Sequence, residues 1–329
     1  MIFTPDFYNK FKCIADKCKD SCCVGWEIDV DAETLEKFKC FSDEALPHVE
    51  LDAEPPYIKL DGEGRCPFLD ESGLCKIISK HGEDFIPEIC KRHPRYFNEI
   101  LNFTECSIGL SCPTAAEIIL SVREKPKTVK LNAFSTREVK TAKIEGEIPT
   151  DEENTVKTLL DLRDEIFSLV FDRRYDMPYI LTKLLGYQRA ISDYLFDGSM
   201  PCEIAPLDAE ELYSVIDLVP LAFSRLELLS EDVRSLAVGA VRERLLSILL
   251  ANADESRALL YYFLHRYMLS GACEFDLDDR VTLCVLLLFI CLAFVDSGVS
   301  AESAALFSKN VEYSTENIDI LLRIIAERY

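Results

Sequence analysis

The sequence predicts a mainly α protein, with a small, irregular α+β cysteine-rich domain at the N-terminus and a helical bundle at the C-terminus. Ten of the 14 cysteines lie within the first 112 residues, which are rich in Gly and Pro and lack long helical periodicity. From Thr150 onward, apolar residues recur at the i, i+3, i+4 spacing of amphipathic helices. We therefore expect a cysteine-rich domain over 1–122, a basic linker or hairpin over 123–149 and an all-helical domain over 150–329.

In the N-terminal part, we expect short elements separated by turns. Asp31 to Phe41 is predicted as a helix, because Leu35, Phe38 and Phe41 share one face and acidic residues occupy the first turn. Short strands are expected over 57–60 and 66–78, the second broken by a turn at 70–73. Ser111 is expected to cap a helix over 112–122, with Pro113 tolerated in its first turn.

The segment from Ser121 to Lys143 is the one basic stretch of the chain. The segment contains seven Lys or Arg and two Glu, which gives a local charge of +5. We favour a solvated linker or hairpin, and the alternative is a seat for an acidic partner or for the acidic helical domain.

The C-terminal part predicts a series of helices. Thr150 is expected to cap the first, whose apolar face runs from Val156 to Val170 with Arg163 as its polar exception. Similar periods cover 179–196, 209–229, 231–251, 258–269, 281–295 and 317–325. Cys284 and Cys291 fall within this pattern and are expected to be core residues.

Charge and hydropathy exclude several classes of partner. The 329 residues include 36 Lys and Arg against 58 Asp and Glu, giving a net charge of −22 that disfavours nucleic acid and anionic membranes. The N-terminal residues MIFTPDFYNKFKC lack the apolar core of a secretory signal. The longest apolar run, 281–295, is shorter than the roughly 20 residues that cross a bilayer and predicts a buried helix. We expect a cytoplasmic protein, in which clustered thiols are metal ligands rather than disulfides.

The N-terminal cysteines form closely spaced groups typical of metal-binding loops. Thiolates two to four residues apart can reach one metal, and more distant ones complete its shell. Sulfur ligands favour zinc or an iron–sulfur cluster over magnesium or calcium. A mixed Cys/His zinc site is disfavoured, because no two of the four histidines have His-x3-His spacing. The candidate ligands are Cys13, Cys18, Cys22, Cys23, Cys66, Cys75, Cys90 and Cys112.

Eight candidate ligands exceed the four that one site needs, so two sites, or one cluster with reserve thiols, both fit. Adjacent Cys22 and Cys23 need not bind the same metal, and one of them could serve a second site or act as a redox thiol. Cys40 and Cys106 are instead expected to be buried, inert thiols.

Seven motifs follow one another in a fixed order over roughly residues 5 to 120. They are Phe11-Lys12-Cys13, Cys18, Cys22-Cys23-x-Gly25-Trp26, Cys66-Pro67-Phe68-Leu69, Gly73-Leu74-Cys75, Cys90-x-Arg92-x-Pro94-Arg95 and Leu110-Ser111-Cys112-Pro113-x-Ala115-Ala116. In this order they resemble the flagellin lysine-N-methylase family and, more loosely, the zinc- or iron-chelating cysteine-cluster domains. The resemblance implies S-adenosylmethionine-dependent methylation of surface lysines on flagellin, with a 4Fe–4S cluster held by the cysteines.

The residues themselves restrict how a methyl donor could bind. A dinucleotide-like donor site needs a Gly-rich strand-to-helix turn, but the sole Gly-x-Gly is Gly62-Glu63-Gly64 in a turn before Cys66. The radical pattern Cys-x3-Cys-x2-Cys also fails, because Gly25 stands where the third thiol should be. The donor site would then be of an unfamiliar kind, for example one in which an iron of the cluster with a free coordination position chelates the amino and carboxylate groups of the donor.

Arg92, Arg95 and Trp26 are the candidate donor-binding residues. The arginines could lower the pKa of the Cys90 thiol, stabilise an anionic cluster or bind a carboxylate, or they could simply pack around the ligands and orient them. Trp26 is expected to cover the cluster more readily than to stack on a donor.

The sequence therefore supports three functional hypotheses from different classes. The first is protein-lysine methylation, with flagellin as partner. The second is a zinc- or iron-stapled interaction module without catalysis, and the third is a redox sensor with labile cluster thiols.

Overall fold

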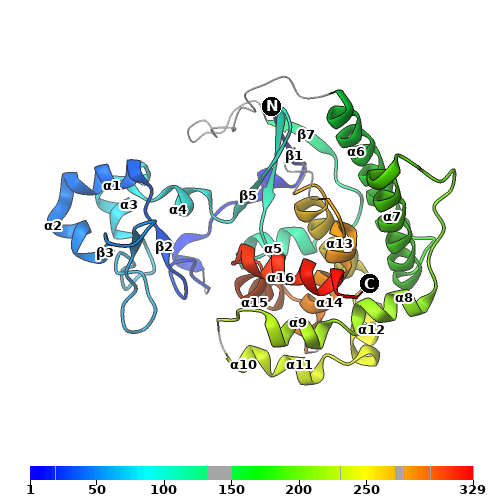
Figure 1. Cartoon of the computed structure of the whole chain (residues 1–329). Coiled ribbons are helices and arrows are strands. Elements are labelled where there is room, and N and C mark those ends of the chain that lie inside the picture. Colours follow the sequence, from blue (N-terminus) through cyan, green and yellow to red (C-terminus); the bar gives the residue numbers. More distant parts are fainter. Residues whose placement is uncertain (19, 132–149, 230, 271–276, 297, 329) are drawn as a thin grey trace. The chain divides into compact units, whose positions relative to one another are not determined.

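The computed structural model describes residues 1–18, 20–131, 150–229, 231–270, 277–296 and 298–328. The chain divides into two compact units. Unit 1 contains Met1–Phe11 and Phe97–Tyr329, and unit 2 contains Lys12–Tyr96. This division follows neither of the predicted boundaries, because the first strand and residues 97–122 belong with the helices (Figure 1).

Unit 2 is built from very short elements around its own apolar core. Its three-stranded antiparallel sheet has the order β2-β4-β3. The strands are β2 (Ile28–Asp29), β3 (Val49–Glu50) and β4 (Tyr57–Ile58). The α-helices are α1 (Ala32–Phe38), α2 (Ser42–Ala45), α3 (Lys76–His81) and α4 (Glu88–Arg92). Single 3-10 turns are η2 (Ala15–Lys17), η3 (Lys39–Phe41), η4 (Leu46–His48) and η5 (Glu83–Phe85).

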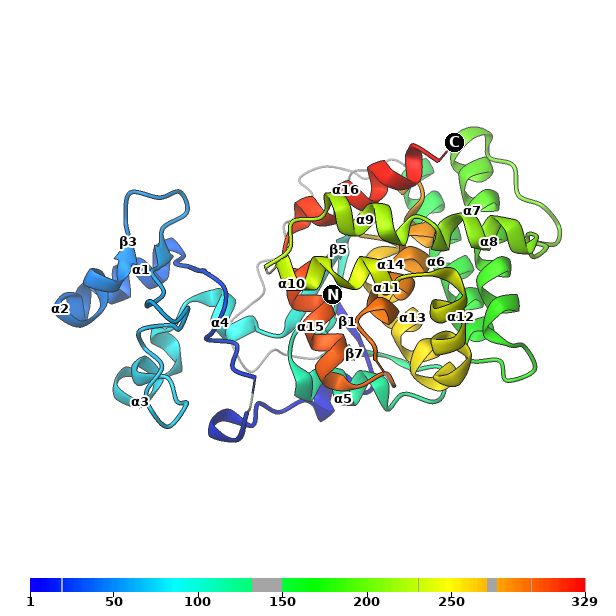
Figure 2. The same ribbon diagram turned by 90° about the horizontal axis from the view of Figure 1, so that it is seen from below.

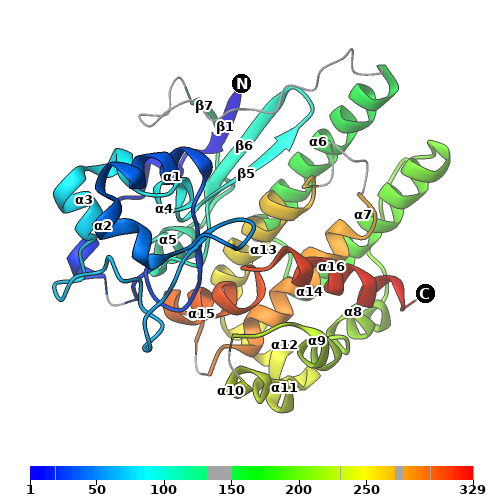
Figure 3. The same cartoon turned by 60° about the vertical axis from the view of Figure 1, so that its left-hand side comes forward.

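Unit 1 carries a four-stranded sheet of order β5-β6-β1-β7. Its strands are β1 (Ile2–Pro5), β5 (Arg95–Ile100), β6 (Phe103–Ile108) and β7 (Thr128–Leu131). β1 pairs in parallel with β6 and antiparallel with β7, so the first residues of the chain lie in the middle of this sheet (Figure 3). A 3-10 turn, η1 (Tyr8–Lys10), follows β1.

The helices of unit 1 surround α14 (Arg280–Ala293), every residue of which is buried (Figure 2). α14 contacts α7, α8, α12, α13, α15 and α16. The helices are α5 (Pro113–Leu120), α6 (Thr150–Val170), α7 (Met177–Asp197), α8 (Ala209–Ile216), α9 (Val219–Arg225), α10 (Glu231–Arg234), α11 (Leu236–Gly239), α12 (Arg242–Ala251), α13 (Ala253–Tyr267), α15 (Ala301–Val311) and α16 (Thr315–Ala326).

The mainly α class and the buried helix at 281–295 are confirmed, and Cys284 and Cys291 are core residues within it. None of the helices in the described ranges is long and apolar enough to cross a membrane. The predicted helix over 209–229 is two helices, since Pro220 lacks the N–H that a continuous helix would donate to Ile216. The predicted helix over 231–251 is likewise three, α10 to α12.

Several predictions for the N-terminal part were wrong in detail. The helix expected over 31–41 ends at Phe38 and continues as 3-10 and short α turns. The pair of strands expected over 66–78 is a single bridge between Leu69 and Cys75, followed by α3. Cys112 rather than Ser111 stands at the N-cap of α5, because Pro113 fixes the first helical position. In the basic segment, β7 is a strand, and residues 132–149 lie outside the described residues.

Candidate metal centre

Two glycine turns bring Cys23 beside Cys66. Gly25 and Gly64 both have positive φ, of 94° and 74°, a conformation that other residues adopt at a cost. The Gly25 N–H donates to the Gly64 carbonyl at 2.9 Å, and the Cys66 N–H donates to the Cys23 carbonyl at 2.8 Å. These hydrogen bonds hold the Cys-Cys-x-Gly segment beside the Gly-x-Cys segment, although Cys23 and Cys66 are 43 residues apart in the sequence.

A second turn places Cys75 opposite Leu69, in the extended segment that follows Cys66. The Asp70 carboxylate accepts the N–H groups of Ser72 and Leu74 at 2.8 and 2.9 Å, closing the turn that the sequence predicts. Leu69 bridges to Cys75, and the Lys76 N–H donates to the Phe68 carbonyl at 2.7 Å. Cys66 and Cys75 therefore flank one tight loop.

Cys90 enters the same region on α4, whose position is fixed by the start of α1. The Asp31 carboxylate accepts the Thr34 N–H, which caps α1, and the Glu88 N–H at the start of α4, each at 2.9 Å. One carboxylate thus joins two helix N-termini that are 57 residues apart. The sequence reasoning identified the acidic first turn but not this bridge.

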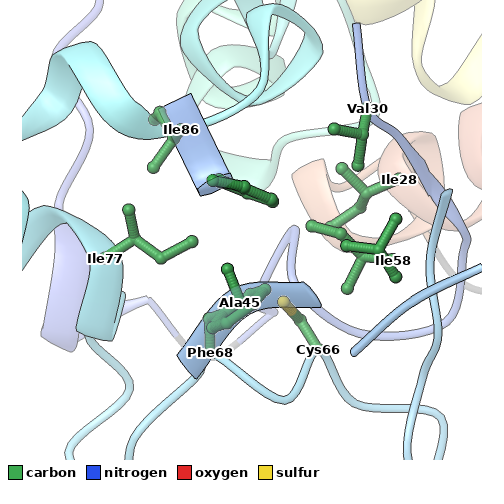
Figure 4. Packing of buried hydrophobic residues seen from close by; sticks show 10 residues of the cluster. Ile28, Val30, Ala45, Ile58, Cys66, Phe68, Ile77 and Ile86 are labelled. Carbon is green, nitrogen blue, oxygen red and sulfur yellow. The ribbon is translucent and has the colours of Figure 1, made fainter. Parts of the chain in front are cut away.

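Cys23, Cys66, Cys75 and Cys90 form what we call the inner thiol set. Cys66 is buried within the apolar core of unit 2, and the other three pack against that core. Figure 4 shows Cys66 among the core side chains, which include Ile28, Ile58, Phe68 and Ile77. Four thiols from three separate stretches of the chain thus lie in or against one small hydrophobic cluster.

The electrostatics of the inner thiol set show that these groups lie close together. Burial raises the pKa of Cys66 to about 12, and negative charge on Cys23 and Cys75 adds to the increase. The pKa values of Cys75 and Cys90 are also raised, chiefly by burial and further by charge on Cys23. The pKa of Cys23 is instead lowered to about 7, because the Cys22 thiol donates a hydrogen bond to its sulfur. Mutual repulsion of this kind is what a cation at the centre would relieve.

Cys13, Cys18 and Cys22 form a second group, the outer thiols, in the loop that precedes the inner set. Cys13 and Cys22 are exposed and Cys18 is half-buried. The pKa of Cys22 is raised, first by its hydrogen bond to Cys23, and the charges of Cys13 and Cys90 contribute to the increase. Cys13 and Cys22 are therefore near neighbours, while the Cys18 thiol donates to the Asp20 carbonyl at 3.3 Å.

The remaining cysteines are outside these two groups. Cys112, a predicted ligand, is half-buried at the N-cap of α5 and belongs to unit 1 rather than unit 2. Cys106 is fully buried in β6, as expected. Cys40 is exposed, contrary to expectation, because α1 has ended before it and η3 turns it outward from the core. Cys273 lies outside the described residues.

The three predicted donor-binding residues lie around α4 and the Cys22–Cys23 loop. The Trp26 indole N–H donates to the Cys22 carbonyl at 2.8 Å, and its ring meets His93 edge to face at 5.8 Å. Arg92 forms an ion pair with Glu88 at 2.9 Å, within α4. Arg95 opens β5.

Sequence reasoning missed two residues next to the candidate ligands. The Ser21 hydroxyl accepts the Cys23 N–H at 3.1 Å and helps to lower the pKa of the Cys23 thiol. His93 packs against Trp26. The Ser-Cys-Cys sequence and the Arg-His-Pro sequence are the local signals that could have indicated them.

The inner set matches a soft metal or cluster in ligand type and in neighbourhood. In the described part of the chain, however, no three His, Cys, Asp or Glu side chains are arranged so that they could hold a metal ion. Binding of a metal or cluster by these thiols would therefore require their sulfur atoms to move from the positions they have in this structure. Deprotonation of the buried thiols would accompany it.

Comparison of the chain with protein-family models, with curated proteins and with solved structures found no match.

Proposed function

We propose that this chain holds a 4Fe–4S cluster through Cys23, Cys66, Cys75 and Cys90, and that it uses S-adenosylmethionine to methylate lysine side chains of a protein substrate, flagellin. The observation that carries the cluster is the convergence of four thiols on one small core. The methylation rests on the family resemblance of the cysteine, Trp26 and Arg92–Arg95 motifs.

Ligand count and ligand type favour a thiolate-bound cluster. Four sulfur ligands complete either a cubane cluster or a zinc site, and soft sulfur disfavours magnesium and calcium. The outer thiols supply reserve ligands in this proposal. The cytoplasm is the compartment in which such thiols stay reduced.

In this proposal, the chain's own residues bind and orient the donor. The ring of Trp26 offers an apolar face, since its N–H is already used by the Cys22 carbonyl. Arg92 and Arg95 would bind the donor carboxylate as bidentate partners, and Arg92 would exchange its ion pair with Glu88 for this contact. The donor supplies a methyl group on a positively charged sulfur. Its transfer to a neutral lysine amine leaves S-adenosylhomocysteine and releases one proton from the methylated nitrogen.

Metal analysis of anaerobically purified protein tests the cluster. We expect a brown protein with near-equal iron and sulfide, and loss of both in Cys66→Ser and Cys90→Ser. Cys202→Ser is the matched control, because Cys202 is exposed in unit 1 and should leave the iron content unchanged. A colourless protein with stoichiometric zinc would replace the cluster with a structural metal.

The mass of flagellin tests the reaction separately. Flagellin from a strain lacking this gene should lose the mass of its lysine methyl groups, and the gene with intact inner thiols should restore it. Unchanged flagellin mass would overturn the methylation while leaving the metal analysis valid.

The second candidate function is a zinc- or iron-stapled interaction module. The small core of unit 2 favours this function, because its three strands have only two residues each. A unit of this size would need a bound metal for its stability, whether or not the metal takes part in catalysis. Zinc without affinity for S-adenosylmethionine would make this module the better account.

A further inference from the structure

An apolar groove lies in unit 1, where α7, α8 and α12 approach one another. It has a volume of about 370 Å³, within the range of small binding sites. Its walls include Pro178 and Tyr179 of α7, Leu207 in the connection to α8, Tyr213 of α8, and Leu246 and Leu250 of α12. Figures 1 and 2 show these three helices on the same side of unit 1. We call this feature the α7–α12 groove.

The walls of the groove are held in place by contacts outside it. The Leu207 N–H donates to the Thr182 carbonyl at 3.0 Å, and the Lys183 ammonium donates to the Ile204 carbonyl, so the connection is fastened along α7. Tyr179 stacks on Tyr175 with ring centroids 4.5 Å apart. These contacts within the chain fix the walls of the groove, so little ordering of the walls is needed when a partner binds.

One apolar residue that lines the groove is largely exposed to solvent. Leu250 is 54% exposed, although other large apolar side chains lie beside it in the groove. Contact of this apolar surface with water is unfavourable in free energy. Covering Leu250 would remove apolar surface from water, so the occupant must present a bulky apolar side chain.

The charged residues around the groove determine which charge a binding partner should carry. Asp176, Asp208, Glu210 and Glu243 are exposed and adjoin the wall residues in the sequence or in space. Within the described residues none of these four carboxylates has an ion pair, whereas the nearby Arg242 is paired with Asp217 and lies 4.4 Å from the Tyr213 ring.

These acids also sit at the N-termini of α7, α8 and α12, where they interact with the helix dipoles. Each dipole contributes only about half a positive charge, so three helix ends offset fewer than two of the four carboxylates. The rim therefore stays negative, and it favours a positively charged partner.

We propose that the α7–α12 groove binds a basic, amphipathic polypeptide segment of another protein, with a leucine-like side chain in the groove and Lys or Arg side chains on the acidic rim. The site does not depend on the proposed methylation, since an interaction module needs such a surface as well. It is also a site of unit 1 alone and uses none of the candidate metal ligands.

Binding of a labelled peptide to the full-length, metal-loaded protein tests the proposal. The probe is a short synthetic peptide with two leucines flanked by lysines, followed by fluorescence anisotropy. Leu250→Glu should weaken binding about tenfold or more, since it removes one apolar contact and adds a charge to the groove. Leu306→Glu is the matched control, because Leu306 is a similarly exposed leucine, 46% exposed, on α15.

Neutralising carboxylates of the rim tests the electrostatic contribution to peptide binding and leaves the apolar walls of the groove unchanged. Glu210→Gln combined with Glu243→Gln should weaken binding about threefold to tenfold and reduce its dependence on salt. This double variant also covers the case in which Leu250→Glu fails to fold.

Three outcomes would overturn the proposal. Equal affinity for a peptide whose lysines are replaced by glutamates would remove the charge argument. Unchanged affinity in Leu250→Glu would place the peptide elsewhere. Absence of peptide binding, together with a concentration-dependent dimer that Leu250→Glu abolishes, would make a second copy of this chain the occupant.

Discussion

Arg163 is the polar exception on the otherwise apolar face of α6, and its partner is Glu105 on β6. The two side chains form a bidentate ion pair, with N–O distances of 2.7 and 2.5 Å, and both residues are about 5% exposed. Burial alone would raise the pKa of the Glu105 carboxyl, but the Arg163 guanidinium holds it below its usual value. At the residue scale, this pair explains why the helical pattern tolerates an arginine in the core.

Removing one member of this pair should strongly destabilise unit 1. We expect Arg163→Met to lower the free energy of unfolding by about 3–5 kcal/mol, since it leaves a buried carboxylate uncompensated. Urea unfolding followed by circular dichroism measures this. Arg174→Met is the control, because Arg174 pairs with Asp172 at the surface and should change stability by less than about 1 kcal/mol. A similar loss in both variants would contradict the assignment.

His265 on α13 makes the stability of the protein depend on pH. Burial lowers the pKa of His265 to about 4 from its usual 6.5. Between these values the unfolded chain binds the proton and the folded chain does not, so stability is fully present above pH 6.5 and is lost on acidification towards pH 4. The slope should approach about 1.4 kcal/mol per pH unit. His265→Gln should flatten the curve of unfolding free energy against pH in this window, and an unchanged slope would assign the effect to other groups.

At the scale of elements, the position of α4 in unit 2 depends on the cap of α1. Asp31 caps α1 and also accepts the Glu88 N–H, so the helix that carries Cys90 is tied to a helix more than 50 residues away in the sequence. The hydrogen bonds from Glu88 and Thr34 lower the pKa of Asp31 against the opposing effect of burial.

Asp31→Ala should therefore affect both folding and metal retention. We expect a loss of about 1–2 kcal/mol in the stability of unit 2, because two helix N-termini lose their acceptor. Iron or zinc should also dissociate faster. Asp43→Ala, at an exposed carboxylate of α2, should change neither quantity. Normal metal retention in Asp31→Ala would show that α4 is positioned by other contacts.

A glycine fixes the connection between α7 and α8 against α7. A Cβ on Gly186 would come within 2.1 Å of the Ala205 carbonyl oxygen, so Gly186→Ala cannot gain its usual helix stabilisation. We expect a loss of about 1–3 kcal/mol instead. Thermal unfolding measures it, and Gly62→Ala, where nothing lies within 4 Å, is the control. A stabilising Gly186→Ala would mean that the connection moves away at no cost.

At the scale of the whole molecule, the two units have different sources of stability. Unit 1 has a helix buried on all sides, whereas unit 2 has a small core that includes Cys66 and against which Cys23, Cys75 and Cys90 pack. The single Trp of the chain, Trp26, belongs to unit 2 and reports on that unit alone.

In the metal-bound protein that we propose, removal of the metal should unfold unit 2 and spare unit 1. After chelation we expect a large change in Trp26 fluorescence and proteolytic cleavage within 12–96, while 97–329 resists cleavage and most helical circular dichroism persists. Simultaneous loss of both units would show that they fold as one. Full protection of 12–96 without metal would show that the core of unit 2 suffices.

The sequence alone determined the features that depend on neighbouring residues. The i, i+3, i+4 periods predicted most helices of unit 1, and the run at 281–295 predicted the buried α14. The spacing of the cysteines predicted metal ligands, which stays a prediction. These patterns are local, because a helix turns every 3.6 residues and a loop brings together thiols that are a few residues apart.

Only the tertiary structure decided which distant residues meet. It placed β1 between β6 and β7, paired Arg163 with Glu105, set Cys112 in unit 1 and brought Cys23, Cys66, Cys75 and Cys90 to one core. It also formed the α7–α12 groove from helices that no motif connects. Such contacts depend on packing and hydrogen bonding between residues that are far apart in the sequence, so local sequence patterns do not predict them.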